Sequence, residues 1–482
     1  MTSARRPFLT LLVASLLGAC ATIDSTPDAP SIATNDRAQA AQTHTQIMQQ
    51  LGGAVEGSAS AYVATIGERV AGAAGVPGQC TFTLVNSEVI NAFAVPGCYI
   101  YVTRGLLAIM NSEDELASVL GHEVGHVVAD HAARRQNTAT LSGLGALLAG
   151  VLTGSGEIAQ MAGQAAQFYA LSYSRDQEFE ADDLGVRYLQ RTGYNAYAAS
   201  DLLNALGSSE ALSQRTSGRE TASATPAWAR THPLSADRVN RANAQAAATG
   251  ATRDAPPERV APYFAAIDGM LYGDDPEQGF VNGRTFSHPT LRIAFEAPQG
   301  FSLTNSPSAV LIAGPNNLRA QFGGGALQGD LTAYATNGLR QLLGNTPSQV
   351  GQTRRSTTNG LETVTAPARA QAQGGQVVDV AVTAYRVGDR AYHFITIAPS
   401  GTGGAFASML SSMRPLTAQQ AAALRARVID VVQVRAGDTG QSLARRMAYD
   451  DYQLERFLVL NGRESNQPLR TGEQVKLVIY AR

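Results

Sequence analysis

Residues 122–126 read His-Glu-Val-Gly-His, an H-E-x-x-H pattern that decides the fold of the region around it. His122 and His126 are four residues apart, so on a helix they share one face and both imidazoles can bind one ion at ~2.0–2.1 Å. Glu123 projects beside that face, where its carboxylate can reach a water on the ion without binding the ion. The pattern is typical of a zinc site with the glutamate as general base. The alternative is a helix with surface histidines.

A capping box predicts the helix that this pattern requires. Ser112 and Glu115 form S-x-x-E, in which each side chain satisfies a backbone N–H group of the first helical turn. Apolar residues at helical spacing continue to about Arg135. His131 follows His126 by five residues and would point away from the ion, so we expect it to pack or to form a hydrogen bond.

A hydrolytic zinc site needs a third protein ligand and an open position for water. A second helix is predicted from about Ser174 to just before Gly193, and it carries Glu178 and Asp182 one turn apart on one face. One of these carboxylates can bind the metal while the other orients a ligating imidazole. Glu180 points to another face and is expected to be solvated. An ordinary acidic helix surface is the alternative.

Three separated motifs of the chain resemble peptidase family M48. They are residues 91–97 (NAFAVPG), residues 121–126 (GHEVGH) and residues 174–182 (SRDQEFEAD). The resemblance implies a mainly α-helical gluzincin protease domain with a small sheet, which we place at residues 38–250. It also implies a zinc metalloendopeptidase.

The resemblance assigns roles to individual residues. It implies one Zn²⁺ per chain, bound by His122, His126 and Glu178. It makes Glu123 the general base. Asp182 would accept a hydrogen bond from a ligating histidine.

Further positions follow from the same resemblance. It implies that Asn91, Ala92 and Phe93 belong to an edge strand along which the substrate backbone lies. His232, in a Thr-His-Pro segment, matches a histidine that can approach the zinc from a loop and occupy the water site; by itself it is an ordinary loop histidine. Arg238 matches an arginine that could steady an oxyanion.

The N-terminus indicates export. Two arginines precede a short apolar run and Leu-Gly-Ala-Cys, which resembles a bacterial lipobox with a signal peptide at residues 1–19 and a diacylated Cys20. Residues 20–37 have the composition of a tether. Because residue 21 is Ala and not Asp, we expect a periplasmic protein anchored by its lipid to the outer membrane. The alternative is an ordinary signal, cleaved near Ala21.

Two further cysteines are expected to pair in an oxidising compartment. Cys80 and Cys98 lie in or beside neighbouring predicted strands. Two unpaired buried thiols are the alternative. Cys98 also departs from the M48 pattern, in which a second glycine is common at this position.

The remainder of the chain predicts a multidomain protein. Residues 251–284 read as a connector, and residues 285–417 as an α+β domain of unknown role. Residues 428–482 resemble a LysM domain, a βααβ fold whose members often bind N-acetylglucosamine polymers such as peptidoglycan. Gly440 departs from that pattern, because a bulky aliphatic residue is usual there.

Composition limits the partners. The chain has 482 residues and a formal charge of −2, which gives no electrostatic case for nucleic acid. We therefore expect polypeptide substrates, a membrane contact through lipid on Cys20 and a peptidoglycan contact through the C-terminal domain. The predicted function is cleavage of misfolded or misassembled envelope proteins. The alternatives are a cell-wall-docked assembly factor or chaperone with latent peptidase activity and, more weakly, a peptidoglycan hydrolase.

Overall fold

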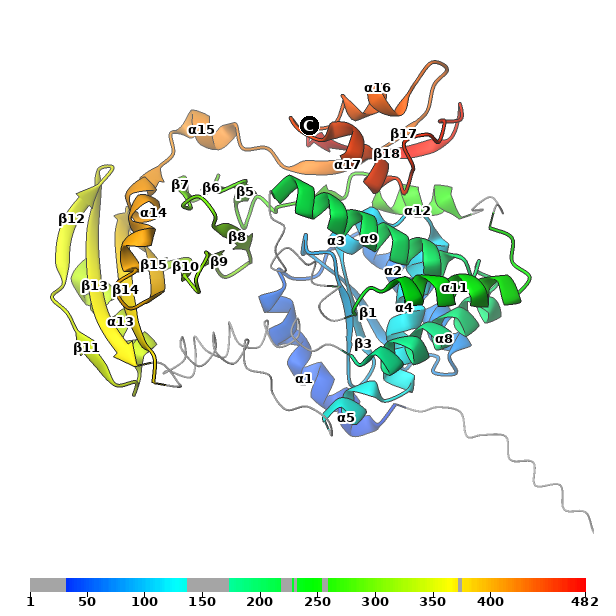
Figure 1. Cartoon of the computed structure of the whole chain (residues 1–482), viewed down its shortest axis with the longest axis horizontal. Helices are drawn as coiled ribbons and strands as arrows, with labels where there is room; N and C mark the ends of the chain where they lie inside the picture. Colours follow the sequence, from blue (N-terminus) through cyan, green and yellow to red (C-terminus); the bar gives the residue numbers. More distant parts are fainter. Residues whose placement is uncertain (1–31, 137–172, 218–227, 229–231, 254–258, 372–374) are drawn as a thin grey trace, which may run out of the picture.

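The computed structural model describes residues 32–136, 173–217, 228, 232–253, 259–371 and 375–482. The predicted signal peptide and residues 20–31 of the predicted tether, Cys20 included, lie outside the described residues. None of the described helices combines the length and the apolar character needed to cross a membrane. Figure 1 shows a helical body, a sheet-rich body and a small C-terminal unit on top of the helical body.

The helical body combines helices with a three-stranded sheet. Its strands, in the order β1-β3-β2, have β1 parallel to β3 and β2 antiparallel at the edge. Their bounds are β1 Thr81–Val85, β2 Ala92–Val95 and β3 Tyr99–Thr103. The helices are α1 Thr34–Gln50, α2 Ser58–Ala73, α3 Arg104–Ile109, α4 Glu113–Val128, α5 His131–Gln136, α8 Arg175–Thr192, α9 Ala198–Ser217, α11 Ala236–Ala248 and α12 Val260–Ile267.

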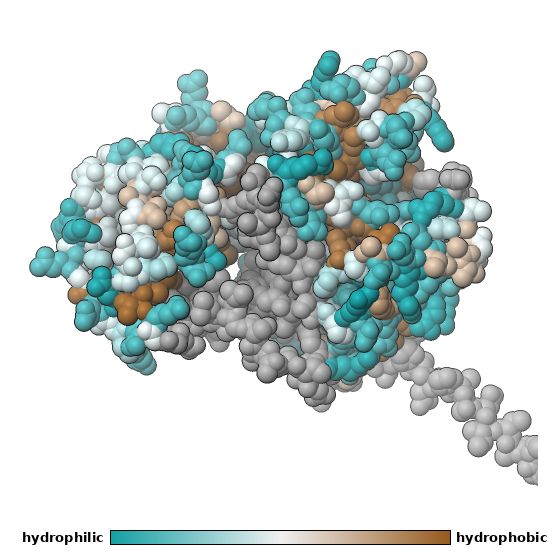
Figure 2. Space-filling view, viewed as in Figure 1, coloured by the Kyte–Doolittle hydropathy of each residue, from teal (hydrophilic) through white to brown (hydrophobic). Residues whose placement is uncertain are grey.

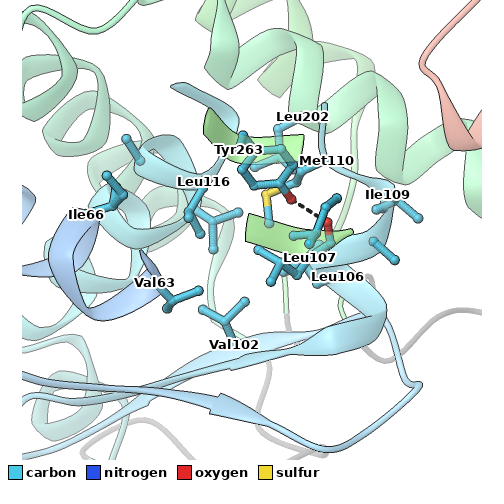
Figure 3. Packing of buried hydrophobic residues seen from close by; sticks show 14 of the residues in the cluster. Val63, Ile66, Val102, Leu106, Leu107, Ile109, Met110, Leu116, Leu202 and Tyr263 are labelled. Carbon is cyan, nitrogen blue, oxygen red and sulfur yellow. Dashed lines mark hydrogen bonds between the residues drawn. The ribbon is translucent and has the colours of Figure 1, made fainter. Parts of the chain in front are cut away.

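Apolar faces of these elements meet in one core. On α2, Val63, Ile66 and Val70 recur at helical spacing and are fully buried, as expected for a helix that packs through one stripe. Figure 3 shows side chains of α2, β3, α3, α4, α9 and α12 in a single cluster. Within it, the Tyr263 hydroxyl donates to the Leu107 carbonyl oxygen. Helix α4, which carries the H-E-x-x-H pattern, is therefore held in place by this core.

Helix α1 begins inside the segment that the sequence predicted as tether. Ala40, Ile47 and Leu51 are buried in a cluster with residues of β2 and β3. This apolar stripe gives the segment a surface to bury, and a freely moving tether has none. The first helix consequently starts at Thr34, four residues before the predicted domain boundary at residue 38.

Helix α4 is shorter than predicted. Its N-cap Ser112 accepts from the Glu115 amide, which is one half of the predicted capping box, whereas the Glu115 carboxylate accepts from the Asn111 amide. The helix ends at Val128 and not near residue 135. Asp130 follows with a φ of 53°, in the left-handed region that ends helices. A new helix, α5, begins at His131, so His131 returns toward the face of α4 that carries the histidines.

The sheet-rich body is an antiparallel α+β unit. Its larger sheet has the order β11-β13-β14-β15-β10-β9-β8, with β12 paired to β13, and its smaller sheet the order β16-β7-β6-β5. Neighbouring residues of β15 face opposite sides: Ile395 packs with α13, and Phe394 packs toward the smaller sheet and α14. The bounds are β5 Phe280–Asn282, β6 Thr285–His288, β7 Ile293–Glu296, β8 Ser302–Asn305, β9 Val310–Ala313, β10 Arg319–Ala326, α13 Leu331–Leu343, β11 Ser348–Val350, β12 Arg354–Thr358, β13 Leu361–Gln371, β14 Val377–Val387, β15 Arg390–Pro399, α14 Ala407–Ser412, β16 Arg414–Pro415 and α15 Ala418–Ala422.

The C-terminal unit has the element order strand, helix, helix, strand. The elements are β17 Arg427–Gln433, α16 Gly440–Ala444, α17 Gln453–Leu460 and β18 Gln474–Tyr480. Its two strands are antiparallel, and a third strand, β4 (Leu271–Tyr272), pairs with β17. The predicted connector thus contributes β4, α12 and β5, because Tyr263 and Phe264 are apolar enough to enter the core of the helical body.

One face of the molecule is mainly hydrophilic where its residues are described. In Figure 2, hydrophilic residues cover most of the visible face, and the hydrophobic patches on it are small and separated. Scattered apolar residues of this kind are normal on a protein surface.

Candidate metal centre

Four buried side chains converge at one point of the helical body. They come from α4, α8 and the segment before α11, and each offers one potential ligand atom within 4.8 Å of the others; they are His122, His126, Glu178 and His232. Each is at most 5% exposed. Within the described residues, this is the single group of at least three His, Cys, Asp or Glu side chains that could hold a metal ion.

The spacing of these atoms fits one small cation. His122 Nε2 lies 3.0 Å from His126 Nε2 and 3.2 Å from His232 Nδ1. Glu178 Oε1 lies 3.0 Å from His232 Nδ1 and 3.6 Å from His126 Nε2. Tetrahedral ligands at ~2.0–2.1 Å from a zinc ion lie about 3.3 Å apart. The donor set and its spacing therefore suit Zn²⁺.

Small residues bring α4 and α8 close enough for this convergence. A Cβ added at Gly125 would lie 3.2 Å from the Ala181 carbonyl oxygen, and one added at Gly185 would lie 3.3 Å from the His122 amide nitrogen. Both contacts are tighter than ordinary van der Waals contact. The glycines therefore allow α8 to approach α4, which places Glu178 opposite the paired histidines.

Asp182 orients the first histidine. Its Oδ1 lies 2.9 Å from His122 Nδ1, so Nδ1–H donates to the carboxylate and Nε2 keeps the lone pair that faces the centre. Arg238 binds the same carboxylate through Nε and Nη2, each at 2.8 Å. Burial opposes ionisation of Asp182, but the guanidinium outweighs it and holds the pKa of this carboxyl well below its usual range.

The structure uses Arg238 differently from the predicted oxyanion role. Its Nη1 lies 2.7 Å from Glu178 Oε2, and the side chain is 2% exposed. All three guanidinium nitrogens thus contact the carboxylates of Glu178 and Asp182. The reason is electrostatic, since two carboxylates this deeply buried need a compensating charge.

His131 orients the second histidine. The Nδ1 atoms of His126 and His131 lie 2.7 Å apart, and His131 Nε2 lies 3.2 Å from Glu180 Oε2. With Nε2–H donated to Glu180, His131 Nδ1 accepts from His126 Nδ1–H, and His126 Nε2 faces the centre without a proton. Arg134 also donates to Glu180. Glu180 therefore pairs with His131 and Arg134, whereas the sequence had suggested a carboxylate in contact with solvent only.

Replacing His131 tests this orienting contact. We expect His131→Phe to weaken zinc binding about 10- to 100-fold, because His126 loses the acceptor that fixes its tautomer. Competition with a chromophoric chelator measures the dissociation constant. Arg187→Met is the control, because Arg187 lies on the exposed face of α8 and donates to the Asp183 carbonyl oxygen. An unchanged affinity in His131→Phe would make His131 a packing residue.

Glu123 and His232 face each other beside the cluster. Glu123 is fully buried, and its Oε1 lies 3.6 Å from His232 Nε2, while His232 Nδ1 faces the other donor atoms. Burial, only partly offset by the neighbouring His122, raises the pKa of the Glu123 carboxyl to about 7. The His232 ring thus lies between Glu123 and the other donor atoms of the centre.

Electrostatics favours the ligating forms of the other groups. Burial and the adjacent His122 ring lower the pKa of His126 and keep its imidazole neutral. Burial disfavours the Glu178 carboxylate, but His232 and Arg238 outweigh that effect and lower the pKa of Glu178. A metal site needs neutral imidazoles and an ionised carboxylate.

Two aromatic residues that the sequence did not indicate flank the centre. Tyr173 stacks on His126 with ring centroids 3.7 Å apart, and Trp228 stacks on His232 at 4.3 Å. Trp228 is the only tryptophan of the chain, and this was the feature of the sequence that could have drawn attention to it. Both rings shield the histidines on their flat sides and limit how His232 can turn.

The strand β2 lies at the edge of the sheet beside the site. The backbone amide of Ala94 interacts with the Glu123 carboxyl, so β2 runs past the proposed base. Asn91 and Ala92 are fully buried, and the Asn91 side chain has no hydrogen-bond partner among the described residues. The Phe93 ring stacks on Tyr101 beneath α1 with centroids 4.8 Å apart, so its side chain serves the core.

A disulfide links the turn between β2 and β3 to the residue before β1. Cys80 and Cys98 are bonded, with Cα atoms 4.6 Å apart. Cys98 has a φ of 60°, in the left-handed region that favours glycine. The residue that departs from the M48 pattern thus keeps the backbone conformation of a glycine, and the covalent link to the residue before β1 holds it there.

Fold and donor set together define the class: a metallopeptidase domain in which one helix carries H-E-x-x-H and a second carries a glutamate. Residues 58–246 match the model of Peptidase family M48. This part of the chain is therefore a peptidase family M48 domain, as its sequence motifs predicted.

Relatives among curated proteins agree over the same region. The chain is 36% identical over 196 residues to the beta-barrel assembly-enhancing protease of Yersinia pestis, covering 38% of each chain. It is 33% identical over 213 residues to a putative beta-barrel assembly-enhancing protease of Vibrio cholerae, covering 42% of this chain and 41% of that one. It is also 37% identical over 124 residues to the mitochondrial metalloendopeptidase OMA1 of Arabidopsis thaliana, covering 26% and 25%. The chain spans about two-fifths of the first two relatives.

Proposed function

We propose that this protein is a zinc-dependent endopeptidase of the bacterial periplasm that cleaves misfolded or misassembled envelope proteins. The observation that carries the proposal is the convergence of His122, His126 and Glu178 beside a buried, unligated Glu123. A scaffold without catalysis would have no need of Glu123. The names of the bacterial relatives support an envelope substrate.

The residues divide the work of hydrolysis. His122, His126 and Glu178 would hold a zinc ion, which would supply a Lewis acid and lower the pKa of a water toward neutral. Glu123 takes the proton from the attacking water and returns it to the leaving amine. An extended substrate adds to the edge of β2 through main-chain hydrogen bonds, which selects backbone conformation more than sequence.

His232 supports a second candidate, an assembly factor or chaperone whose peptidase is latent. Its ring fills the space between Glu123 and the metal ligands. In this state water cannot take the position from which Glu123 would activate it. Activity then depends on a minor population in which the loop that carries His232 has moved.

One set of digests separates these candidates. We expect the purified full chain to hold one zinc and to cleave casein or an unfolded outer-membrane protein in a chelator-sensitive manner. His232→Ala should raise the rate, by about tenfold or more if the open state is a minor one. If the peptidase is latent, the His232→Ala variant cleaves the substrate and the unaltered chain does not. Absence of zinc and of cleavage in both proteins would refute the proposal.

The location and the wall contact are parts of the same proposal. We infer a lipid on Cys20, an attachment to the outer membrane and a LysM-like C-terminal unit. The element order of that unit supports the last inference, as does a surface cavity of about 570 Å³ lined in part by Arg435, Arg446, Thr471 and Gly472. Sedimentation with purified peptidoglycan tests glycan binding, and a muropeptide assay tests the weaker alternative of peptidoglycan hydrolysis.

A further inference from the structure

Lys476 is the only lysine among 482 residues, while the other 36 basic residues are arginines. It lies on β18 of the C-terminal unit and is 0% exposed. A lysine is almost never fully buried without partners. Its partners therefore indicate what the C-terminal unit is docked against.

The ammonium of Lys476 caps a helix of the M48 domain. Nζ donates to the carbonyl oxygen of Ala108 at 2.7 Å and to that of Met110. These carbonyls belong to the last turn and the C-cap of α3, where a cation is favoured by the helix dipole and by unsatisfied acceptors. The aromatic ring of Phe264 lies 5.6 Å from Nζ. The compact, multiply donating ammonium suits converging carbonyls better than a planar guanidinium does.

This contact lies directly before the helix that carries the metal ligands. Asn111 follows the capped turn, and its amide donates to Glu115 Oε2 at 3.0 Å. Glu115 is in the first turn of α4 and is 8% exposed. His122 lies seven residues, or two turns, further along the same face. The path from Nζ to the metal ligands thus crosses one residue, one hydrogen bond and two helical turns.

Hydrophobic contacts add to this docking. Ile429, Phe457 and Val475 of the C-terminal unit belong to the same buried cluster as Leu116 and Leu120 of α4. Figure 1 shows the unit resting above α9, α3 and α12. Figure 3 shows Ile109 and Met110, next to the capped carbonyls, within that cluster. The C-terminal unit is therefore an integral part of the helical body.

We propose that Lys476 is a positioning residue, which fixes the junction between α3 and α4 and so holds the metal-binding helix in place from the C-terminal unit. The inference rests on the proposed metal site but not on cleavage. It predicts that docking and zinc binding favour each other. Such coupling is reciprocal, so each event must strengthen the other by the same factor.

The first test measures zinc affinity in charge variants of the full chain. We expect Lys476→Met, which keeps the length of the side chain but removes its donors, to bind zinc about tenfold more weakly. Arg470→Met removes an exposed cation of the same unit and should bind zinc within about twofold of the unaltered chain. Circular dichroism establishes that both variants are folded. Unchanged affinity in a folded Lys476→Met protein would overturn the inference.

The second test needs no variant. Because the chain has one lysine, reductive methylation followed by mass spectrometry of its peptide reports how often the docked unit opens. Zinc should slow modification of Lys476 by about tenfold, while hydrogen exchange of the α2 core, which reports global unfolding, slows less. Equal slowing of both, or none, would assign Lys476 a merely structural role. This measurement decides alone if Lys476→Met fails to fold.

Failure of the inference and failure of the proposed function give different results. An active zinc enzyme without coupling would refute only the role of Lys476. Zinc binding coupled to Lys476 in a protein that cleaves nothing would refute only the proposed function.

Discussion

Glu123→Gln should abolish peptide cleavage and leave zinc bound. The amide has the size of the carboxylate but cannot take a proton, and loss of a general base costs about 10²- to 10⁴-fold in kcat/KM. The fully buried Glu123 is not among the converging ligand atoms, so the metal content should not change. Elemental analysis and a fluorogenic peptide assay measure the two quantities on the same sample.

The control and the background decide how this result is read. Glu68→Gln makes the same change at an exposed glutamate of α2 and should have no effect. Because the His232 ring lies beside Glu123, the comparison should also be made in the His232→Ala background, where the rate to be lost is larger. Cleavage that persists in the double variant would show that another group takes the proton.

Local patterns in the sequence were enough to predict the two histidines that converge at the candidate metal centre, whereas Glu178 was singled out by the family resemblance. H-E-x-x-H places His122 and His126 on one face because helical periodicity is a property of neighbouring residues. The caps at Ser112 and Ser174 are equally local, and both are present. Such features depend little on the rest of the fold.

Features that depend on contacts between distant segments were missed or assigned a different role. The His126–His131 contact requires α4 to end at Val128, and the left-handed Asp130 that produces this break has no strong signal. Burial of Lys476 likewise depends on how two parts of the chain pack.

Arg238 shows how packing changes a predicted role, and it leads to the second large effect. We expect Arg238→Met to lower the free energy of unfolding of the metal-free protein by about 3–5 kcal/mol. In the unaltered chain, the carboxylates of Asp182 and Glu178 lie 2.7–2.8 Å from the guanidinium. The substitution leaves both carboxylates buried without a compensating charge. Urea unfolding in the presence of a chelator measures the change.

A neighbouring arginine provides the matched control. Arg241, three residues further on α11, pairs with Asp183 at 2.6 Å, but both side chains are at least one-third exposed. Removal of such an exposed pair costs less than about 1 kcal/mol, so Arg241→Met should unfold almost as the unaltered chain does. Added zinc should reduce the difference in the free energy of unfolding between Arg238→Met and Arg241→Met, because the cation neutralises Glu178 in place of Arg238. A stable Arg238→Met protein with a reduced kcat would instead restore the oxyanion role that the sequence suggested.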